Sequence, residues 1–178
     1  MQMISWLISI MSIASVVSMA GNAPGRRSPA TAEGIAKAAV LAGTWKTDGQ
    51  QLATDFSKAS HDTSTLRNDC WRSGEFYSCD QYVNGESKAL IVFTFNPGDG
   101  TYNTYAIVYG GTPASSGKLK IDGDTWTYGG VKDSSSPPPY YRTVNVFEGD
   151  DTIHFTVQYT RDNQHWITMN QGVETRQK

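Results

Sequence analysis

The sequence has no strong excess of charge of either sign. Its 178 residues include 15 basic and 17 acidic side chains, which give a formal net charge of −2. Because no basic stripe is present, the composition argues against nucleic acid or an anionic membrane surface as a partner. Size and composition are instead those of one globular domain with a real core.

Histidine and cysteine are scarce, with three and two residues respectively. His61, His154 and His165 are the only histidines, and no two are spaced like metal ligands on one strand or helix. A β-barrel that binds haem would need a histidine that points into its interior. His154 lies in a strand-like segment, residues 152–160, where it falls among the polar residues of the alternating pattern, so it is expected to point outward. Ser60, His61 and Asp62 are adjacent in sequence, which does not make a triad in space, and no Gly-x-Ser-x-Gly motif occurs. We therefore predict no catalytic residue, no metal site and no cofactor.

Acidic residues gather in short segments that are typical of tight turns. Residues 96–100, 122–124 and 149–151 combine Asp or Asn with Gly, and they lack the spacing of known calcium-binding loops. No acidic residue lies clearly on an apolar strand face. The sequence therefore nominates no pair of carboxylates for acid–base catalysis.

The one long uncharged apolar run lies at the N-terminus. Trp6–Met19 is too short to span a bilayer well, and Ser18 and Ala20 are small residues at the −3 and −1 positions of a cleavage site. We expect residues 1–20 to be a signal peptide cleaved after Ala20, with an uncleaved anchor as the alternative, since no Lys or Arg precedes the run. The expected location is secreted or periplasmic, in a bacterium, with no membrane association after cleavage.

The mature chain is expected to begin with a flexible lead-in and a helix. Residues 21–28 are small and polar, and residues 29–178 form the predicted domain. Pro29 suits a first helical turn, the Ala-rich stretch up to Ala42 favours a helix, and Gly43 ends it.

Cys70 and Cys79 are the only cysteines, and the residues between them indicate a hairpin. A two-residue type II′ turn needs a positive φ at its first central position, which Gly74 supplies without steric cost. Counting outward from Gly74 and Glu75 makes Cys70 and Cys79 a directly opposed, non-hydrogen-bonded pair. Such a pair has Cα atoms about 4.5 Å apart, within disulfide range. We predict a cross-strand disulfide and hence an oxidising compartment.

Beyond Gly43 the chain alternates short strand patterns with turn signals. The expected fold is all-β, an antiparallel meander that closes into an 8–10-stranded β-barrel with a short N-terminal helix, because closure removes exposed edges. Residues 134–139 (Ser-Ser-Ser-Pro-Pro-Pro) are expected to form a long stiff loop, with a Pro-rich recognition segment as the alternative. The expected strands cover 44–47, part of 51–58, the two arms of the cysteine hairpin, 90–95, 102–109, 118–121, 125–128, 140–147, 152–160 and 165–176.

The strand expected at Thr152–Thr160 alternates most clearly. Ile153, Phe155, Val157 and Tyr159 are apolar or aromatic, and the residues between them are polar. One face of the sheet is therefore dry, and in a small barrel the dry face points inward. In the cysteine hairpin Trp71 and Phe76 form the more apolar face, so we expect the disulfide on the outer or rim side.

Residues 41–46 (Leu-Ala-Gly-Thr-Trp-Lys) follow the helix with a Gly-x-Trp motif at the first barrel strand. This arrangement resembles the calycin superfamily, the lipocalins and their relatives. Together with the expected signal peptide, the Cys-Trp…Gly-Glu-Phe…Cys pattern of residues 70–79 and the Tyr-Thr-Arg-Asp…Trp pattern of residues 159–166, it is most similar to the secreted bacterial proteins with a lipocalin-like domain of unknown function. The resemblance implies that Trp45 packs across the closed end of the barrel, with Arg176 of the last strand over its ring. Such stacking contributes about 0.5–2 kcal/mol.

Aromatic residues are the remaining resource for a binding site. Many belong to the core by default, but aromatic side chains with a polar tip also line pockets for amphipathic ligands. The tentative pocket residues are Tyr105, Tyr109, Trp126, Tyr128 and Tyr159.

Three functions remain open. The leading hypothesis is binding of a small apolar or aromatic molecule in the barrel. An isomerase or cyclase of the cavity type would require a buried ionisable residue facing the cavity. A surface or structural module would have a filled interior.

Overall fold

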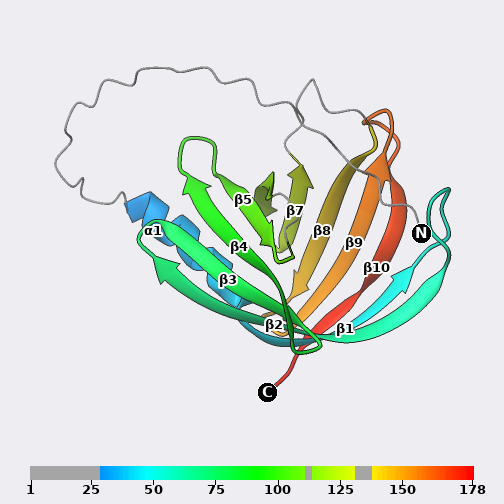
Figure 1. The fold of residues 1–178 in the computed structure, drawn as a ribbon. Coiled ribbons are helices and arrows are strands. Elements are labelled where there is room, and N and C mark those ends of the chain that lie inside the picture. The colour runs from blue at the N-terminus through cyan, green and yellow to red at the C-terminus, as the bar shows by residue number, and fades with distance from the viewer. Residues whose placement is uncertain (1–28, 111–113, 131–137) are drawn as a thin grey trace.

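The computed structural model describes residues 29–110, 114–130 and 138–178. The expected signal peptide, the lead-in and most of the Ser-Pro segment lie outside these ranges. The described chain contains one short α-helix, one 3₁₀ turn and ten strands (Figure 1). The elements are α1 (Pro29–Lys37), η1 (Ala38–Leu41), β1 (Gly43–Gln51), β2 (Ser60–Ser73), β3 (Phe76–Val83), β4 (Glu86–Asn96), β5 (Thr101–Val108), β6 (Ser115–Asp122), β7 (Thr125–Gly130), β8 (Tyr140–Glu148), β9 (Thr152–Thr160) and β10 (Ile167–Arg176).

The ten strands form a closed antiparallel barrel in meander order. Each strand pairs with its sequence neighbours, and β10 pairs with β1 to complete the ring, so that the last strand lies beside the first in Figure 1. The predicted fold class is confirmed. One strand prediction within residues 51–58 was wrong, because β1 continues to Gln51 and residues 52–59 connect it to β2. The last strand begins at Ile167, two residues later than expected.

The pairing registers determine which side chains face the interior. Trp45 lies opposite Arg176 on β10 and Leu66 on β2, and Ile153 lies opposite Phe147 and Glu174. Because side chains alternate along each strand, these pairings extend one inward face around the whole ring. The core that results contains Trp45, Tyr77, Cys79, Phe93, Tyr102, Leu119, Trp126, Phe147 and Ile153, together with Ile35 and Ala38 from the N-terminal segment.

The N-terminal helix packs against the end of the barrel where β1 begins, which we call the closed end. Ile35 of α1 and Ala38 of η1 are fully buried there. Gly34 allows the Phe95 ring to approach, since a Cβ on it would lie only 2.4 Å from that ring. The Gly34 carbonyl accepts a 2.6 Å hydrogen bond from the buried Tyr102 hydroxyl, and burial raises the pKa of Tyr102 to about 12. This end is therefore filled.

Two facing glycines make room for an aromatic ring on the inward face of the barrel. Gly49 on β1 lies opposite Gly172 on β10, and the Phe155 ring covers both. A Cβ on Gly172 would lie 2.1 Å from the carbonyl oxygen of Asp48 and 2.8 Å from the Phe155 ring. Because neither glycine has a side chain, β1 and β10 can approach each other closely, and the Phe155 ring can occupy the space above them.

The cysteine hairpin has the predicted register and the opposite orientation. Cys70 pairs directly with Cys79, their Cα atoms are 4.0 Å apart, and Gly74 has a φ of +63°, so the predicted disulfide is confirmed. However, Cys79 is only 3% exposed in the core, whereas Trp71 and Phe76 are 46% and 50% exposed. The outward placement of the disulfide was wrong. The reason is that Tyr77 and Cys79 pair with the inward Phe93 and Ile91 of β4, and these long-range pairings override the local apolar pattern.

Within the described ranges no helix has the length and apolarity needed to cross a membrane.

Candidate functional site: the barrel cavity

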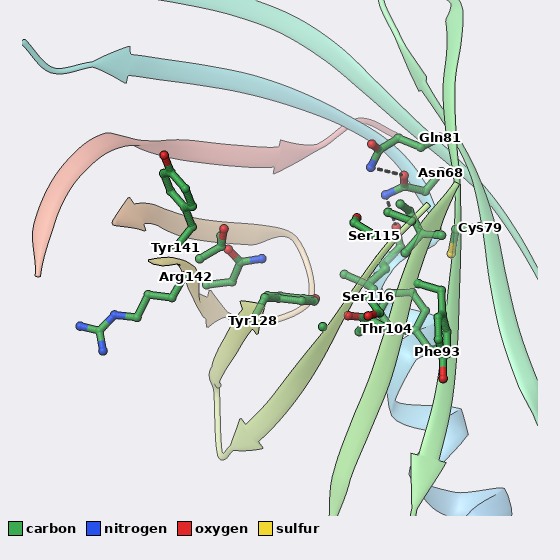
Figure 2. Close-up of a pocket in the computed structure, with 18 of the residues that line it drawn as sticks. Asn68, Cys79, Gln81, Phe93, Thr104, Ser115, Ser116, Tyr128, Tyr141 and Arg142 are labelled. Carbon is green, nitrogen blue, oxygen red and sulfur yellow. Dashed lines mark hydrogen bonds between the residues drawn. The ribbon is translucent and has the colours of Figure 1, made fainter. Parts of the chain in front are cut away.

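The barrel interior contains a cavity of about 650 Å³ beyond its filled core. Its wall comes from residues on β2 to β8 and β10, with Leu41 of η1 (Figure 2). The apolar part consists of Leu41, Leu66, Cys79, Ile91, Phe93 and Ala106, and the polar part includes Asn68, Gln81, Thr104, Ser115, Ser116, Thr143, Asn145 and Glu174, with Tyr105, Tyr128, Tyr141 and Arg142. A volume of this size lies within the range of about 300–1,000 Å³ that is usual for small-molecule sites.

One side of the cavity is held by hydrogen bonds to η1. The Leu41 carbonyl accepts hydrogen bonds from the Asn68 amide at 3.0 Å and the Trp45 indole at 3.2 Å. Gln81 in turn donates to the Asn68 side-chain oxygen at 3.4 Å, as the dashed lines in Figure 2 show. These contacts connect the Gly-x-Trp segment to the wall. They also engage the amide nitrogens of Asn68 and Gln81 within the protein.

Tyr128 reaches into the cavity from β7. Its side chain points towards the side of the wall that carries Thr104 and Ser116 (Figure 2). Burial raises the pKa of Tyr128, and the nearby Glu174 carboxylate and Tyr102 contribute further. The phenol therefore stays protonated at neutral pH and can donate a hydrogen bond to a ligand.

Glu174 places a carboxyl group on the cavity wall. It lies on β10 directly opposite Thr47 of β1 and Ile153 of β9, on the inward face. Burial raises the pKa of Glu174, and the neighbouring Thr47 hydroxyl offsets part of that effect. Desolvation of a carboxylate is unfavourable without a donor or a cation beside it. Glu174 is therefore the ionisable group of this site with the most to gain from a ligand.

The sequence analysis missed Glu174, although a signal for it was present. The local pattern of the last strand places Val173 on the apolar face, which would put its neighbour Glu174 outside. Arg176, however, was expected over Trp45, at the inward closed end. Because inward residues are spaced by two, that expectation also places Glu174 inside.

The two arginines nearest to the interior are both engaged elsewhere. The Arg142 guanidinium donates from Nε to Gln158 at 2.7 Å and stacks on the Trp166 ring at 4.0 Å, and Figure 2 shows its side chain leading away from the other labelled residues. Arg176 stacks on Trp45 at 4.1 Å and donates to the carbonyls of Val40, Ala42 and Asp150. The implied Trp45–Arg176 contact is thus present in the structure.

The five aromatic residues predicted for the pocket divide into two groups. Tyr105 and Tyr128 line the cavity. Tyr109 lies outside it, where its hydroxyl donates to Asp80 at 2.7 Å. Trp126 is a core residue whose ring packs at a tilt against Phe147, and Tyr159 is buried against the ring of Phe56; neither contributes to the wall of this cavity. Tyr141 on β8 also lines the cavity, although the sequence analysis did not nominate it. The local sequence around an aromatic residue does not show how far that residue lies from a pocket formed by other strands.

The three histidines are exposed on the outside of the barrel or in its loops. His61, His154 and His165 contact the carboxylates of Asp48, Glu148 and Asp162 respectively, at 2.7, 3.2 and 2.6 Å. The contact with Asp162 raises the pKa of His165. None of the three lines the cavity. Among the described residues, no group of three or more His, Cys, Asp or Glu side chains is arranged to hold a metal ion.

Comparison with known proteins supports the fold alone. No family model and no curated protein matches the chain. Among solved structures, the crystal structure of Rv2717c from M. tuberculosis is similar, with a TM-score of 0.53 and 14% sequence identity. The match covers 85% of this chain and 99% of that chain. At this identity the likeness extends to the barrel architecture and to nothing finer.

Proposed function

We propose that this protein is a secreted or periplasmic, lipocalin-like barrel that binds a small molecule with an aromatic or apolar body. The observation that carries the proposal is the cavity of about 650 Å³. A water molecule occupies about 30 Å³ of liquid, so the volume is far larger than a packing defect. A filled structural barrel would not leave such a space.

The composition of the wall supports a small organic ligand. Leu66, Ile91 and Phe93 provide an apolar surface, and the hydroxyl and amide groups that also line the cavity can orient a bound molecule. Binding sites for small molecules typically combine a mostly apolar wall with a few polar groups.

The calycin resemblance is part of the proposal. It is supported by Trp45, which is buried at the closed end with Arg176 over its ring. The Cys70–Cys79 disulfide fits the proposed location, since such bonds persist in oxidising compartments. Export through a signal peptide over residues 1–20 completes the proposal, and N-terminal sequencing of the mature protein should begin at Gly21.

A fluorescence titration tests ligand binding. The probe is N-phenyl-1-naphthylamine, a neutral aromatic molecule that becomes brighter in an apolar site. The variant is Ala106→Phe, which places a ring in the cavity. The control is Ile107→Phe, which places the same phenylalanine side chain one residue along β5 on the outer face. Saturable binding that Ala106→Phe abolishes and Ile107→Phe retains supports the proposal. No saturable binding, or equal binding by all three proteins, contradicts it.

A second candidate function is catalysis inside the same cavity, and Glu174 is the observation that favours it. An isomerase or cyclase of this type needs a buried ionisable group, and the cavity is lined by two such groups, Glu174 from β10 and Tyr128 from β7. Recovery of a bound molecule chemically unchanged after long incubation would favour binding over catalysis.

A further inference from the structure

The charges on the cavity wall are unbalanced. Glu174 is the one acidic residue among the described lining residues, and Arg142 is the one basic residue. The Arg142 guanidinium is held by Gln158 and the ring of Trp166, so it does not neutralise Glu174. A molecule inside the barrel therefore meets a carboxyl group without a compensating cation.

The polar part of the wall also offers hydrogen-bond acceptors to a ligand, since the hydroxyl oxygens of Thr104, Ser115 and Thr143 each have acceptor lone pairs. The side-chain nitrogens of Asn68 and Gln81 donate to protein acceptors. By contrast, the buried side-chain oxygen of Asn145 accepts no hydrogen bond from any residue that the structure describes. Buried polar atoms without a partner are uncommon in native proteins, but this oxygen is enclosed by protein atoms. The acceptors that line the cavity for a ligand are therefore the hydroxyl oxygens and the Glu174 carboxyl group.

We propose that the cavity prefers a ligand with a protonated amine on an aromatic or apolar body, and that Glu174 is the counter-charge for the amine. This inference rests on the proposed function and specifies the class of ligand. An ammonium group has three donors and no acceptor, which suits a carboxylate and the surrounding hydroxyl oxygens. The aromatic body packs against Phe93 and Ile91 on the facing wall.

The same geometry argues against two other ligand classes. A carboxylate ligand would place a like charge near Glu174, which is unfavourable in a partly desolvated site. A neutral ligand of equal shape would leave the Glu174 carboxylate without a compensating positive charge. The expected order of affinity is therefore amine, then alcohol, then carboxylate.

Three naphthalene compounds of nearly equal size test this order. They are 1-naphthylmethylamine, which is protonated at neutral pH, 1-naphthalenemethanol, which is neutral, and 1-naphthoate, which is anionic. Isothermal titration calorimetry on the wild-type protein should give the amine a Kd about tenfold or more below that of the alcohol. Equal affinities, or a preference for the anion, would overturn the inference and leave the proposed function standing. If none of the three binds, the proposed function fails as well.

Glu174→Gln tests the residue directly, since it removes the charge and keeps the shape. Amine affinity should fall about tenfold while alcohol affinity stays within about twofold of wild type. The control is Glu148→Gln, which removes one negative charge from the outer face of β8 and should change neither affinity. If Glu174→Gln binds the amine as tightly as the wild-type protein does, Glu174 is not the counter-charge for the amine, and the inference is overturned. If this variant does not fold, the affinity order in the wild-type protein decides the matter alone.

Discussion

The Arg176 guanidinium lies over the Trp45 indole ring, with its carbon 4.1 Å from the ring centroid. The indole nitrogen donates to the Leu41 carbonyl, and the guanidinium donates to the carbonyls of Val40 and Ala42. One strand-to-strand contact thus anchors the segment between the helix and β1. Because Leu41 and Asn68 border the cavity, the anchor also supports the binding site.

Trp45→Ala should be among the most destabilising single substitutions. The side chain is almost fully buried in the core, so its removal leaves a large void and costs about 3–5 kcal/mol in the free energy of unfolding. Urea denaturation measures the loss, and Trp71→Ala, at an exposed tryptophan, is the matched control with a cost below about 1 kcal/mol. Similar losses for both variants would mean that Trp45 is not the anchor.

Arg176→Lys should also destabilise the barrel, although the charge is kept. The guanidinium donates to three backbone carbonyls and contacts Asp151 at 3.0 Å, a set that a single ammonium cannot reproduce. The expected loss is about 1–3 kcal/mol in the free energy of unfolding, measured in urea. Wild-type stability in this variant would show that charge alone suffices at this position.

The disulfide should stabilise the barrel without being essential to it. The mass of the non-reduced protein should be two hydrogens below that of the reduced chain, and free thiols at both positions would contradict the structure. Since the closed loop is short, the double variant Cys70→Ala/Cys79→Ala should lose about 2–3 kcal/mol and still fold. Because Cys79 lines the cavity, the same variant should also weaken probe binding, whereas a disulfide on the outer face would leave binding unchanged.

The hairpin shows which part of a fold local sequence determines. Gly74 fixes the turn, the turn fixes the register, and the register pairs the cysteines, so these features followed from about ten residues. Orientation did not, because Trp71 and Phe76 make the wrong face more apolar. The inward face is set by pairing with β4, and thus by residues distant in sequence.

The candidate site was even less accessible from sequence. Tyr105 and Tyr128 were nominated as aromatic residues with polar tips, and the same reasoning nominated Tyr109, which lies outside. The presence of a cavity depends on how side-chain volumes from ten strands add up in the interior, which no local pattern records. Glu174 could have been identified only by extending the Trp45–Arg176 pairing one step along β10.

Glu174 should make the stability of the wild-type protein depend on pH. Burial raises its pKa in the folded state above the ordinary value of 4.5, so the folded protein binds the proton more tightly than the unfolded chain does. The contribution from this group is fully present below pH 4.5 and is lost as pH rises through the folded-state pKa. Because glutamine does not titrate, the Glu174→Gln variant should not lose stability in this way as the pH rises.

Urea denaturation at acidic and neutral pH therefore compares wild type with Glu174→Gln. The stability of the variant relative to wild type should increase from acidic to neutral pH. Glu148→Gln, at an exposed site, is the control without this trend. A pH-independent difference, or a trend of the opposite sign, would mean that the Glu174 carboxyl is solvated.

The crystal structure of the wild-type protein with N-phenyl-1-naphthylamine tests the central claim most directly. The account predicts the probe inside the barrel, with its rings against Phe93 and Ile91 and close to Tyr128. The exposed apolar residues Trp71, Phe76 and Ile107 offer the probe an alternative outside the barrel. A probe bound only on that outer surface, with the interior unchanged, would contradict the account.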